Sequence, residues 1–219
     1  MRAFKRDSIP KEQIEKILEA GRWAPSGINS QPWEFIVVNK KDLRKKIAKI
    51  FIKALQSDKK ADPTFPFADR SYMMDVPAFI IVLGDPRYIE AYPKFHPRGI
   101  IFIQSIAACI QNMLLATASL NLGSVWVTIT KDVESQLKDL LGVPQELRII
   151  NLLPIGLSSS KPAKGQRKSL NELVHYEVYD QNRFIQKEKV LKLISLIKRA
   201  RARIGEVSTY KIEASTWKI

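Results

Sequence analysis

The residues best suited to bind a ligand lie in the stretch 24–33, which reads Ala-Pro-Ser-Gly-Ile-Asn-Ser-Gln-Pro-Trp. Its proline and glycine residues are typical of a loop, and the apolar run that follows, up to residue 38, is typical of a strand. Ser26, Gly27 and Asn29 offer a hydroxyl, an open backbone amide and a carboxamide with little bulk. The stretch therefore predicts a loop between a helix and a strand that binds a polar heterocycle.

No other residues form a pattern typical of catalysis by side chains. The sequence holds two histidines and one cysteine, with no metal-ligand spacing, no Ser-His-Asp set, no Walker loop and no Gly-x-Gly-x-x-Gly. His175 is interpreted as structural rather than as a catalytic base. This composition fits an enzyme whose cofactor carries the chemistry while the protein binds and orients it. No catalytic side chain is therefore predicted.

The stretch 24–33 resembles the Pro-Ser-x-x-Asn-x-Gln-Pro-Trp signature of the FMN-dependent nitroreductase family. Further segments resemble that family in the same order along the chain: residues 2–5, 106–116, 122–126, 141–144, 153–156 and 167–176. A single motif would be weak, but an ordered series is specific. The chain is therefore identified as similar to this family from residue 2 to about residue 179.

The resemblance implies an α/β (α+β) fold, a nitroreductase-like sandwich with a central, mostly antiparallel sheet flanked by helices. It also implies a domain-swapped type of homodimer that binds FMN and takes electrons from NAD(P)H. The expected reaction is a ping-pong hydride transfer to a small-molecule acceptor, a nitroaromatic, a quinone or a related compound. Because the family includes dehalogenating and flavin-fragmenting members, the physiological acceptor stays open.

The residues that would hold the FMN phosphate lie in the C-terminal block. Arg167 falls on a phosphate-binding position of the family, and a guanidinium suits a phosphate. Lys164 is expected to assist, although Gly165 stands where the family has its usual lysine, and a solvated loop lysine is the alternative. The family has further phosphate-binding residues before the position of Arg2. Since the sequence begins at Met1, nearby cations are expected to replace them.

The residues that the resemblance assigns to the rest of the flavin are polar or offer a backbone amide: Arg2, Ser26, Gly27, Asn29, Val127 and Thr128. Arg2 would contact the ribityl and pyrimidine end, where a cation stabilises the negative charge of the reduced ring; a frayed terminus is the alternative. The three loop residues would reach the flavin from the neighbouring subunit. The backbone of Val127 and Thr128 would lie near N5, the ring atom of the flavin that accepts the hydride.

Composition indicates one domain of ordinary size, with 219 residues of which 45% are hydrophobic. No apolar run reaches 18 residues and the first residues lack the apolar core of a signal peptide, so no membrane partner is expected. The single cysteine, Cys109, excludes an internal disulfide and fits a reducing cytoplasm. It lies in an apolar stretch and is interpreted as a small buried hydrophobe.

The net charge of +14 favours anionic partners. The charge is spread along the chain, so a soluble or thermally adapted surface is the preferred interpretation. No nucleic-acid-binding module is present, and nucleic acid is not expected as a partner. The rival to the enzyme hypothesis is nevertheless a non-catalytic flavin-binding protein, for storage or sensing, that associates with nucleic acid through its basic tail.

Hydrophobic periodicity predicts alternating helices and strands with one polar loop. Helices are expected at residues 10–23, 42–55, 100–120, 133–141 and 185–204. Strands are expected at residues 33–39, 77–83, 124–129 and 148–155, and the loop at 57–74. We expect an FMN-binding domain at residues 1–179 and a basic helical extension at residues 180–219. The extension is expected to pack on the dimer, with a nucleic-acid or membrane-surface arm as the alternative.

Overall fold

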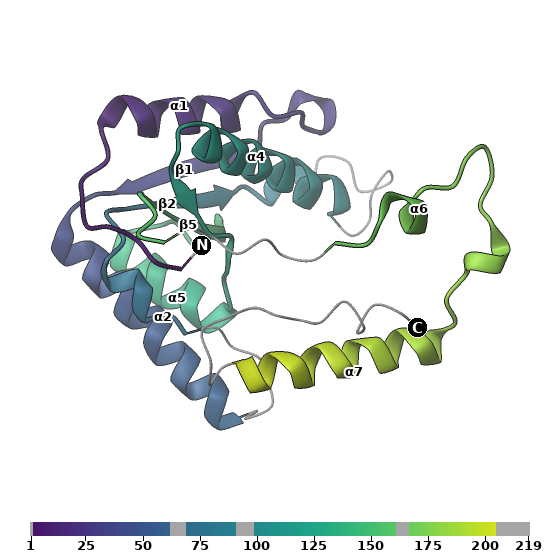
Figure 1. Ribbon diagram of the computed structural model, residues 1–219. Helices are drawn as coiled ribbons and strands as arrows, with labels where there is room; N and C mark the ends of the chain where they lie inside the picture. Colours follow the sequence, from purple (N-terminus) through teal and green to yellow (C-terminus); the bar gives the residue numbers. More distant parts are fainter. Residues whose placement is uncertain (1, 62–68, 91–98, 161–166, 205–219) are drawn as a thin grey trace. The chain divides into compact units, whose positions relative to one another are not determined.

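The computed structural model describes residues 2–61, 69–90, 99–160 and 167–204 (Figure 1). The chain divides into two compact units. The first unit combines Met1–Ala54 with Arg70–Lys161, and the second combines Leu55–Asp69 with Pro162–Ile219. The expected boundary at residue 179 stays a prediction.

The first unit is built on an antiparallel sheet with the strand order β1-β2-β5-β3, in which β4 also pairs with β5. Its strands are β1 (Trp33–Val38), β2 (Ala78–Gly84), β3 (Gly123–Ser124), β4 (Val127–Thr128) and β5 (Arg148–Gly156). All seven residues of β2 are buried, as expected for a central strand covered on both faces. The predicted sandwich with a mostly antiparallel sheet is confirmed.

Helices cover both faces of this sheet (Figure 1). On one face lie α1 (Lys11–Arg22) and α4 (Ile100–Ser119); on the other lie the first part of α2 (Lys41–Ala61) and α5 (Lys131–Leu141). The short α3 spans Arg87–Glu90, and 3₁₀ turns occupy Gly27–Asn29 and Ser71–Met74. Each face of the sheet therefore has its own hydrophobic core.

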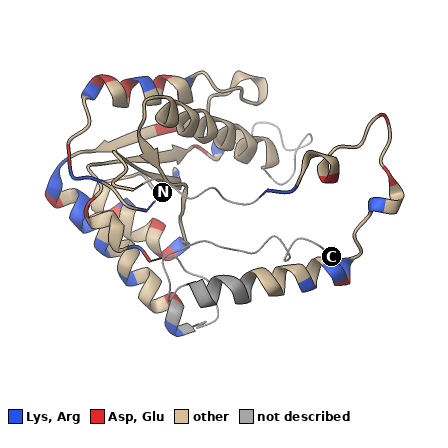
Figure 2. Cartoon of the chain, viewed as in Figure 1, with Lys and Arg blue, Asp and Glu red and all other residues tan. Residues whose placement is uncertain are grey.

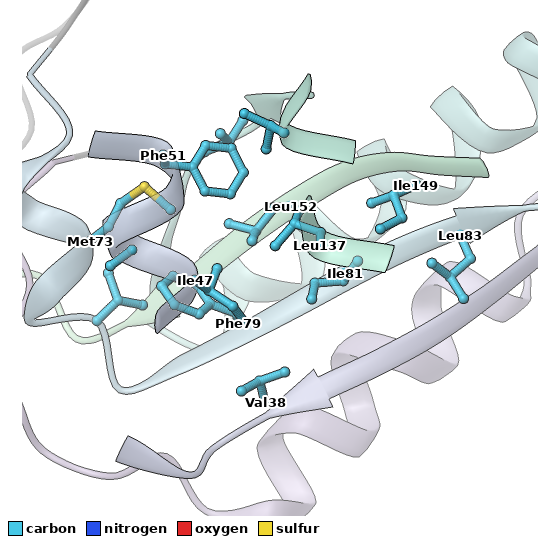
Figure 3. Close-up of a cluster of buried hydrophobic side chains, with 14 of the residues drawn as sticks. Val38, Ile47, Phe51, Met73, Phe79, Ile81, Leu83, Leu137, Ile149 and Leu152 are labelled. Atoms are coloured by element: carbon cyan, nitrogen blue, oxygen red, sulfur yellow. The ribbon is translucent and has the colours of Figure 1, made fainter. Parts of the chain in front are cut away.

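Alternate residues of the strands divide between these two cores. The core on the α2 and α5 face contains fully buried side chains from the sheet, both helices and the 3₁₀ turn at Ser71–Met74, drawn in Figure 3: Ile47, Met73, Phe79, Ile81, Leu137 and Leu152. The core on the other face joins α1 and α4 to the intervening strand residues, among them Ile80, Val82 and Leu153. Two filled layers make the sheet a rigid base for the loops at its ends.

The contact between α1 and α4 is unusually close because of Gly21. A Cβ at Gly21 would lie 2.7 Å from the Cγ of Met113 and 3.1 Å from the sulfur of Cys109. The Asn112 side chain also donates a hydrogen bond to the carbonyl oxygen of Ala20 (3.1 Å). The last turn of α1 is thereby fixed on α4, and so is the start of the loop that follows it.

Helix α4 is the one helix among the described residues that is long and apolar enough to span a membrane by length and composition. Its 20 residues have a mean hydropathy of 1.7 over the best window. One side of the helix is buried against α1 and the sheet, where Phe102, Ile106, Ile110 and Met113 belong to the core. The helix is thus a core element of the first unit.

Two of the predicted boundaries were wrong. The loop expected from residue 57 is helical as far as Ala61, because residues 56–61 contain neither proline nor glycine and Pro63 is the first breaker. The strand expected at residues 124–129 is two short strands, β3 and β4. Ser124 pairs with Ile155 and Val127 with Leu152, so Val125 lies opposite Pro154, which has no N–H to donate to a ladder.

The second unit contains α6 (Leu170–Leu173), a 3₁₀ turn at Gln181–Arg183 and α7 (Lys187–Ile204). His175 stacks on Tyr179 with ring centroids 4.3 Å apart, and its Nδ1 accepts a hydrogen bond from the N–H of Asp180 (3.1 Å). Arg183 donates hydrogen bonds to the carbonyl oxygens of Val174 (2.7 Å) and Asn171. These contacts agree with the structural interpretation of His175. The expected packing of the 180–219 extension stays a prediction.

Candidate functional site

The loop between α1 and β1 is fixed at both ends by the first unit. At its start Ala24 is buried, and its N–H donates to the carbonyl oxygen of Gly21 (3.1 Å). At its end the carbonyl oxygen of Pro32 accepts a hydrogen bond from the N–H of Asp85 (2.9 Å), and Trp33 is buried. The predicted loop between a helix and a strand is confirmed.

The backbone of this loop adopts an unusual conformation at three residues. Ile28, Asn29 and Gln31 have φ angles of 51°, 56° and 45°. The left-handed region is costly for residues other than glycine, most of all for β-branched Ile28. Such a conformation persists only where surrounding contacts hold it, and it is concentrated at ligand-binding and active sites.

Hydrogen bonds inside the loop and to α4 provide those contacts. The N–H of Gln31 donates to Oγ of Ser26 (3.0 Å), which closes the loop on itself. The N–H of Gly27 donates to Oγ of Ser105 on α4 (3.1 Å), and that hydroxyl donates to the carbonyl oxygen of Ile101 (2.7 Å). A Cβ at Gly27 would lie 2.1 Å from Cγ2 of Ile101, so the loop approaches α4 as closely as a glycine permits.

The outer side of the loop presents polar and apolar groups to solvent. Asn29 is exposed, and its carboxamide forms no hydrogen bond within the described residues. Its backbone is engaged on both sides: the N–H donates to the carbonyl oxygen of Ser26 (3.0 Å), and the carbonyl oxygen accepts from Nε2 of Gln31 (3.4 Å). Ile28 is 69% exposed. The loop therefore offers a free carboxamide next to an apolar side chain.

An ion pair holds the last turn of α1 at the entrance to the loop. The Glu19 carboxylate accepts hydrogen bonds from the Arg22 guanidinium (2.6 and 2.8 Å) and from Nε1 of Trp23 (2.6 Å). These bonds, that from Arg22 first, lower the pKa of Glu19 to about 2. The carboxylate therefore stays ionised down to low pH, and it accepts a hydrogen bond from the Trp23 indole, which is 71% exposed beside the loop.

The N-terminal segment is paired with the chain that follows β5. The N–H of Lys5 donates to the carbonyl oxygen of Leu157 (2.9 Å). The N–H of Ser159 donates to the carbonyl oxygen of Ala3 (3.1 Å). The backbone is therefore paired from Ala3 onward, and the alternative of a frayed terminus at Arg2 stays open. The side chain of Arg2 is exposed.

Within one chain Arg2 and the loop lie at opposite ends of the sheet. The loop ends at Trp33, which pairs with Gly84, and Gly84 pairs with Arg148 at the start of β5. The N-terminal segment instead pairs with residues beyond Gly156, the last residue of β5. The eight steps along β5 span roughly 26 Å at about 3.3 Å per residue. This separation exceeds the length of one isoalloxazine ring.

The third group of expected site residues lies on β4. Val127 is fully buried in the core on the α2 and α5 face, so only its backbone could meet a ligand. Thr128 is exposed and pairs with Asn151 of β5. Strand β5 has a bulge at Ile150. Because of this bulge, the side chain of Asn151 lies on the same face of the sheet as that of Val82, its partner in β2. Asn151 is 1% exposed, and its Oδ1 has no hydrogen-bond partner within the described residues.

The expected phosphate-binding residues belong to the second unit or lie outside the described residues. Arg167 is exposed and lies three residues before α6. Lys164 falls in the range 161–166, outside the described residues. The remaining expected site residues all belong to the first unit.

Side-chain chemistry other than binding is scarce. No group of three or more His, Cys, Asp or Glu side chains that could hold a metal ion occurs within the described residues. Cys109 is buried in the core, and this burial raises the pKa of its thiol to about 12. A protonated, buried thiol is neither a nucleophile nor a metal ligand. The interpretation of Cys109 as a small buried hydrophobe is confirmed.

Two residues near the site were not identified from the sequence. Ser105 lies in an apolar helical stretch, where a serine is most often interpreted as a tolerated small residue. Asn151 lies in a strand whose other central residues are apolar. A polar residue at an expected core position was the available signal for both, since buried polar groups require partners.

Comparison with known proteins gives the family. The model of the nitroreductase family matches residues 1–157. A protein of Archaeoglobus fulgidus whose name pairs NADH dehydrogenase with NAD(P)H nitroreductase is 32% identical over 158 residues, covering 71% of this chain and 78% of that one. Iodotyrosine deiodinase of Hydra vulgaris is 28% identical over 189 residues, covering 80% and 68%.

Solved structures agree with this result. A Clostridium acetobutylicum protein that carries the name NADH oxidase superimposes with a TM-score of 0.64 at 26% identity, covering 82% of this chain and 95% of that one. A Bacteroides thetaiotaomicron protein, again named for NADH dehydrogenase and NAD(P)H nitroreductase, superimposes with a TM-score of 0.62 at 25% identity. The match covers 81% of this chain and 91% of that one. The fold and the sequence therefore lead to the same group of proteins.

Proposed function

This chain belongs to the nitroreductase family, and on that basis we propose that it is an FMN-dependent oxidoreductase that uses NAD(P)H to reduce nitroaromatics, quinones or related acceptors. Membership of the family supports a flavin oxidoreductase in general. The observation that carries the finer proposal is the loop at residues 24–32, held in a strained conformation with an exposed carboxamide.

The residues present fit a flavin. The ring of a flavin carries several acceptors and few donors, and its phosphate is dianionic. The exposed Asn29 carboxamide offers N–H donors to the ring, and Thr128 offers a hydroxyl at the edge of the sheet. Arg2 and Arg167 are exposed cations, suited to the pyrimidine end and to the phosphate. Lys164 would assist Arg167.

Bound FMN would supply the redox chemistry, accepting a hydride from NAD(P)H and returning electrons to the acceptor. The chain itself would bind and orient. Arg2 would stabilise the negative charge that develops at the pyrimidine end on reduction. Ser26, Gly27 and Asn29 would fix the ring plane, and the backbone of Val127 and Thr128 would border the reactive edge. No side chain of this chain is assigned a proton-transfer step.

The positions of these residues support a homodimer. Since Arg2 and the loop lie roughly 26 Å apart along β5, one chain does not bring both to a single ring. Two copies related by a two-fold axis across the middle of α4 would place the loop of one subunit near Arg2 of the other. The site would then be complete only in the dimer.

The surface of α4 supports this arrangement. The helix contains no charged residue and appears uniformly tan in Figure 2. Its side away from the core exposes large apolar side chains: Ile100 at 50%, Ile103 at 52% and Leu115 at 60%. An uncharged face with exposed isoleucine and leucine is typical of a surface that a partner covers. A second copy of the chain would bury it.

Steady-state NAD(P)H oxidation with menadione, a nitroaromatic or an iodinated phenol tests the function. Turnover with menadione or the nitroaromatic supports the proposal. Turnover with the iodinated phenol alone would favour reductive dehalogenation, which the similarity to iodotyrosine deiodinases makes the second candidate. A protein that binds flavin but turns over none of them would favour the non-catalytic flavin-binding alternative. A cytoplasmic location stays a prediction.

A further inference from the structure

Ser105 on α4 is a buried polar residue that makes hydrogen bonds in addition to its packing contacts. It is 3% exposed and lies among the apolar residues of the α1 and α4 core. Its hydroxyl donates to the carbonyl oxygen of Ile101 and accepts from the N–H of Gly27. The hydroxyl thus joins the helix to the loop through two hydrogen bonds of 2.7 and 3.1 Å.

The bond to Gly27 meets the loop at the start of its strained part. Gly27 directly precedes Ile28 and Asn29, two of the three residues with positive φ. The N–H of Gly27 would lose its partner if the loop moved away from α4, because Ser105 is the acceptor that it uses. Strained backbone is stable only where such contacts fix it. The geometry points to Ser105 as the residue that sets the distance and direction of the loop.

We propose that Ser105 is a positioning residue for the flavin-binding loop: its hydroxyl holds the Gly27 N–H so that Asn29 is presented in the orientation that binds the ring. The proposal rests on the proposed function for its effect on FMN. Its effect on the loop itself does not depend on any ligand.

Helix α4 contains a matched control for this hydroxyl. Thr117 is also fully buried, and its Oγ1 donates to the carbonyl oxygen four residues earlier, that of Met113, at 2.7 Å. Within the described part of the chain, this hydroxyl makes no hydrogen bond to the loop. Thr117→Val removes a hydroxyl with little change of shape, as Ser105→Ala does. The two variants therefore differ mainly in the bond to Gly27.

Two measurements compare Ser105→Ala, Thr117→Val and the unchanged chain. Hydrogen exchange of the peptide that contains Gly27 is measured first, without any cofactor. We expect Ser105→Ala to speed exchange of that amide about tenfold or more, with the rest of the sheet unchanged, and Thr117→Val to leave it unchanged. FMN is then titrated into each protein, and Kd is taken from quenching of flavin fluorescence.

We expect Ser105→Ala to raise the Kd for FMN about fivefold, as for the loss of one hydrogen bond, and to shift the visible spectrum of bound flavin. Thr117→Val should bind with the Kd of the unchanged chain. Equal exchange at Gly27 in both variants would overturn the proposal, as would equal FMN affinity when the unchanged chain binds FMN. Failure of the unchanged chain itself to bind FMN would contradict the proposed function instead, and the exchange result would still decide the role of Ser105.

Discussion

Gly27 occupies a position where a side chain has no room. A Cβ there would lie 2.1 Å from Cγ2 of Ile101 but 3.5 Å from its Cβ, an ordinary contact. We predict that Gly27→Ala pushes the loop away from α4 and weakens FMN binding about tenfold or more. The double variant Gly27→Ala with Ile101→Ala should recover most of that loss, because the clashing methyl group is gone.

Titration of FMN into the single and the double variant measures the loss of affinity and its recovery. Ile101→Ala alone is the control. An unchanged Kd for Gly27→Ala would show that the loop does not need its close approach to α4. A double variant as weak as the single one would show that the contact with Ile101 is not the cause.

Arg167 is expected to be the main anchor of the phosphate. A charge-assisted hydrogen bond contributes about 1.5–3 kcal/mol, so Arg167→Ala should weaken FMN binding about tenfold to a hundredfold. Lys164→Ala should weaken it only modestly. Fluorescence titration of each variant compares them, and unchanged affinity of Arg167→Ala would mean that the phosphate binds elsewhere.

A charge network joins α5 to β5, buried at Glu134 and Lys138 and half exposed at Arg148. Glu134 accepts hydrogen bonds from the Arg148 guanidinium (2.8 and 3.1 Å) and from the N–H of Ile149 (3.0 Å), and lies 3.8 Å from Nζ of Lys138. Burial alone would raise the pKa of Glu134, but these partners outweigh it, so the pKa lies below its usual 4.5. The carboxylate is therefore more stable in the folded chain than in the unfolded one.

We predict that Glu134→Gln lowers the free energy of unfolding by about 3 kcal/mol at pH 7, because Lys138, 7% exposed at its side chain, then lacks its countercharge. A lowered pKa gives stability that is present above about pH 4.5 and is lost as pH falls through the folded value. The difference between the two proteins should accordingly shrink in acid. Urea unfolding at several pH values measures it.

Asp139→Asn is the control for this variant, since Asp139 is exposed on the same helix and should change stability by less than about 0.5 kcal/mol. A Glu134→Gln protein as stable as this control, or a difference independent of pH, would show that the network contributes little.

Most elements could be predicted from the sequence because their periodicity is strong. The helix of residues 11–22, the buried strand of residues 78–84 and the helix of residues 100–119 were predicted to within a few residues. The division of one expected strand into β3 and β4 could not be predicted, because it depends on Pro154 in a partner strand. Cross-strand register is a property of the folded chain, not of either segment alone.

The candidate site could be predicted only in part. The loop was evident because its polar residues and breakers are contiguous in the sequence. Ser105 and Asn151 were missed because each lies in a largely apolar segment. The partner that gives Ser105 its role, Gly27, is 78 residues away in the sequence. The roles of Arg2, Val127, Thr128, Lys164 and Arg167 stay predictions.

The proposed flavin site needs residues from two copies of the chain. We predict that Ile103→Asp, which puts a charge on the exposed apolar face of α4, converts a dimer to monomers and weakens FMN binding in the same protein. Lys49→Asp on α2 is the control, since it changes charge on a face rich in lysine, visible as blue in Figure 2.

Light scattering at micromolar concentration gives the mass of each variant, and FMN titration gives its affinity. A monomeric Ile103→Asp protein that binds FMN as tightly as the unchanged chain would contradict a site shared between subunits.

Truncation after Tyr179 should destabilise the dimer if the extension packs on it. The truncation would leave the melting temperature unchanged if the extension does not pack on the dimer.

Anaerobic reduction of the FMN-loaded protein tests directly whether this chain is an NAD(P)H-dependent flavin oxidoreductase. NAD(P)H is added without an acceptor, and the visible absorbance of the flavin is followed; menadione or a nitroaromatic is then added. We expect NAD(P)H to bleach the flavin, with one equivalent consumed per chain, and the acceptor to restore the absorbance. A protein that binds no FMN, or whose bound flavin is not bleached by either NADH or NADPH, would contradict the account.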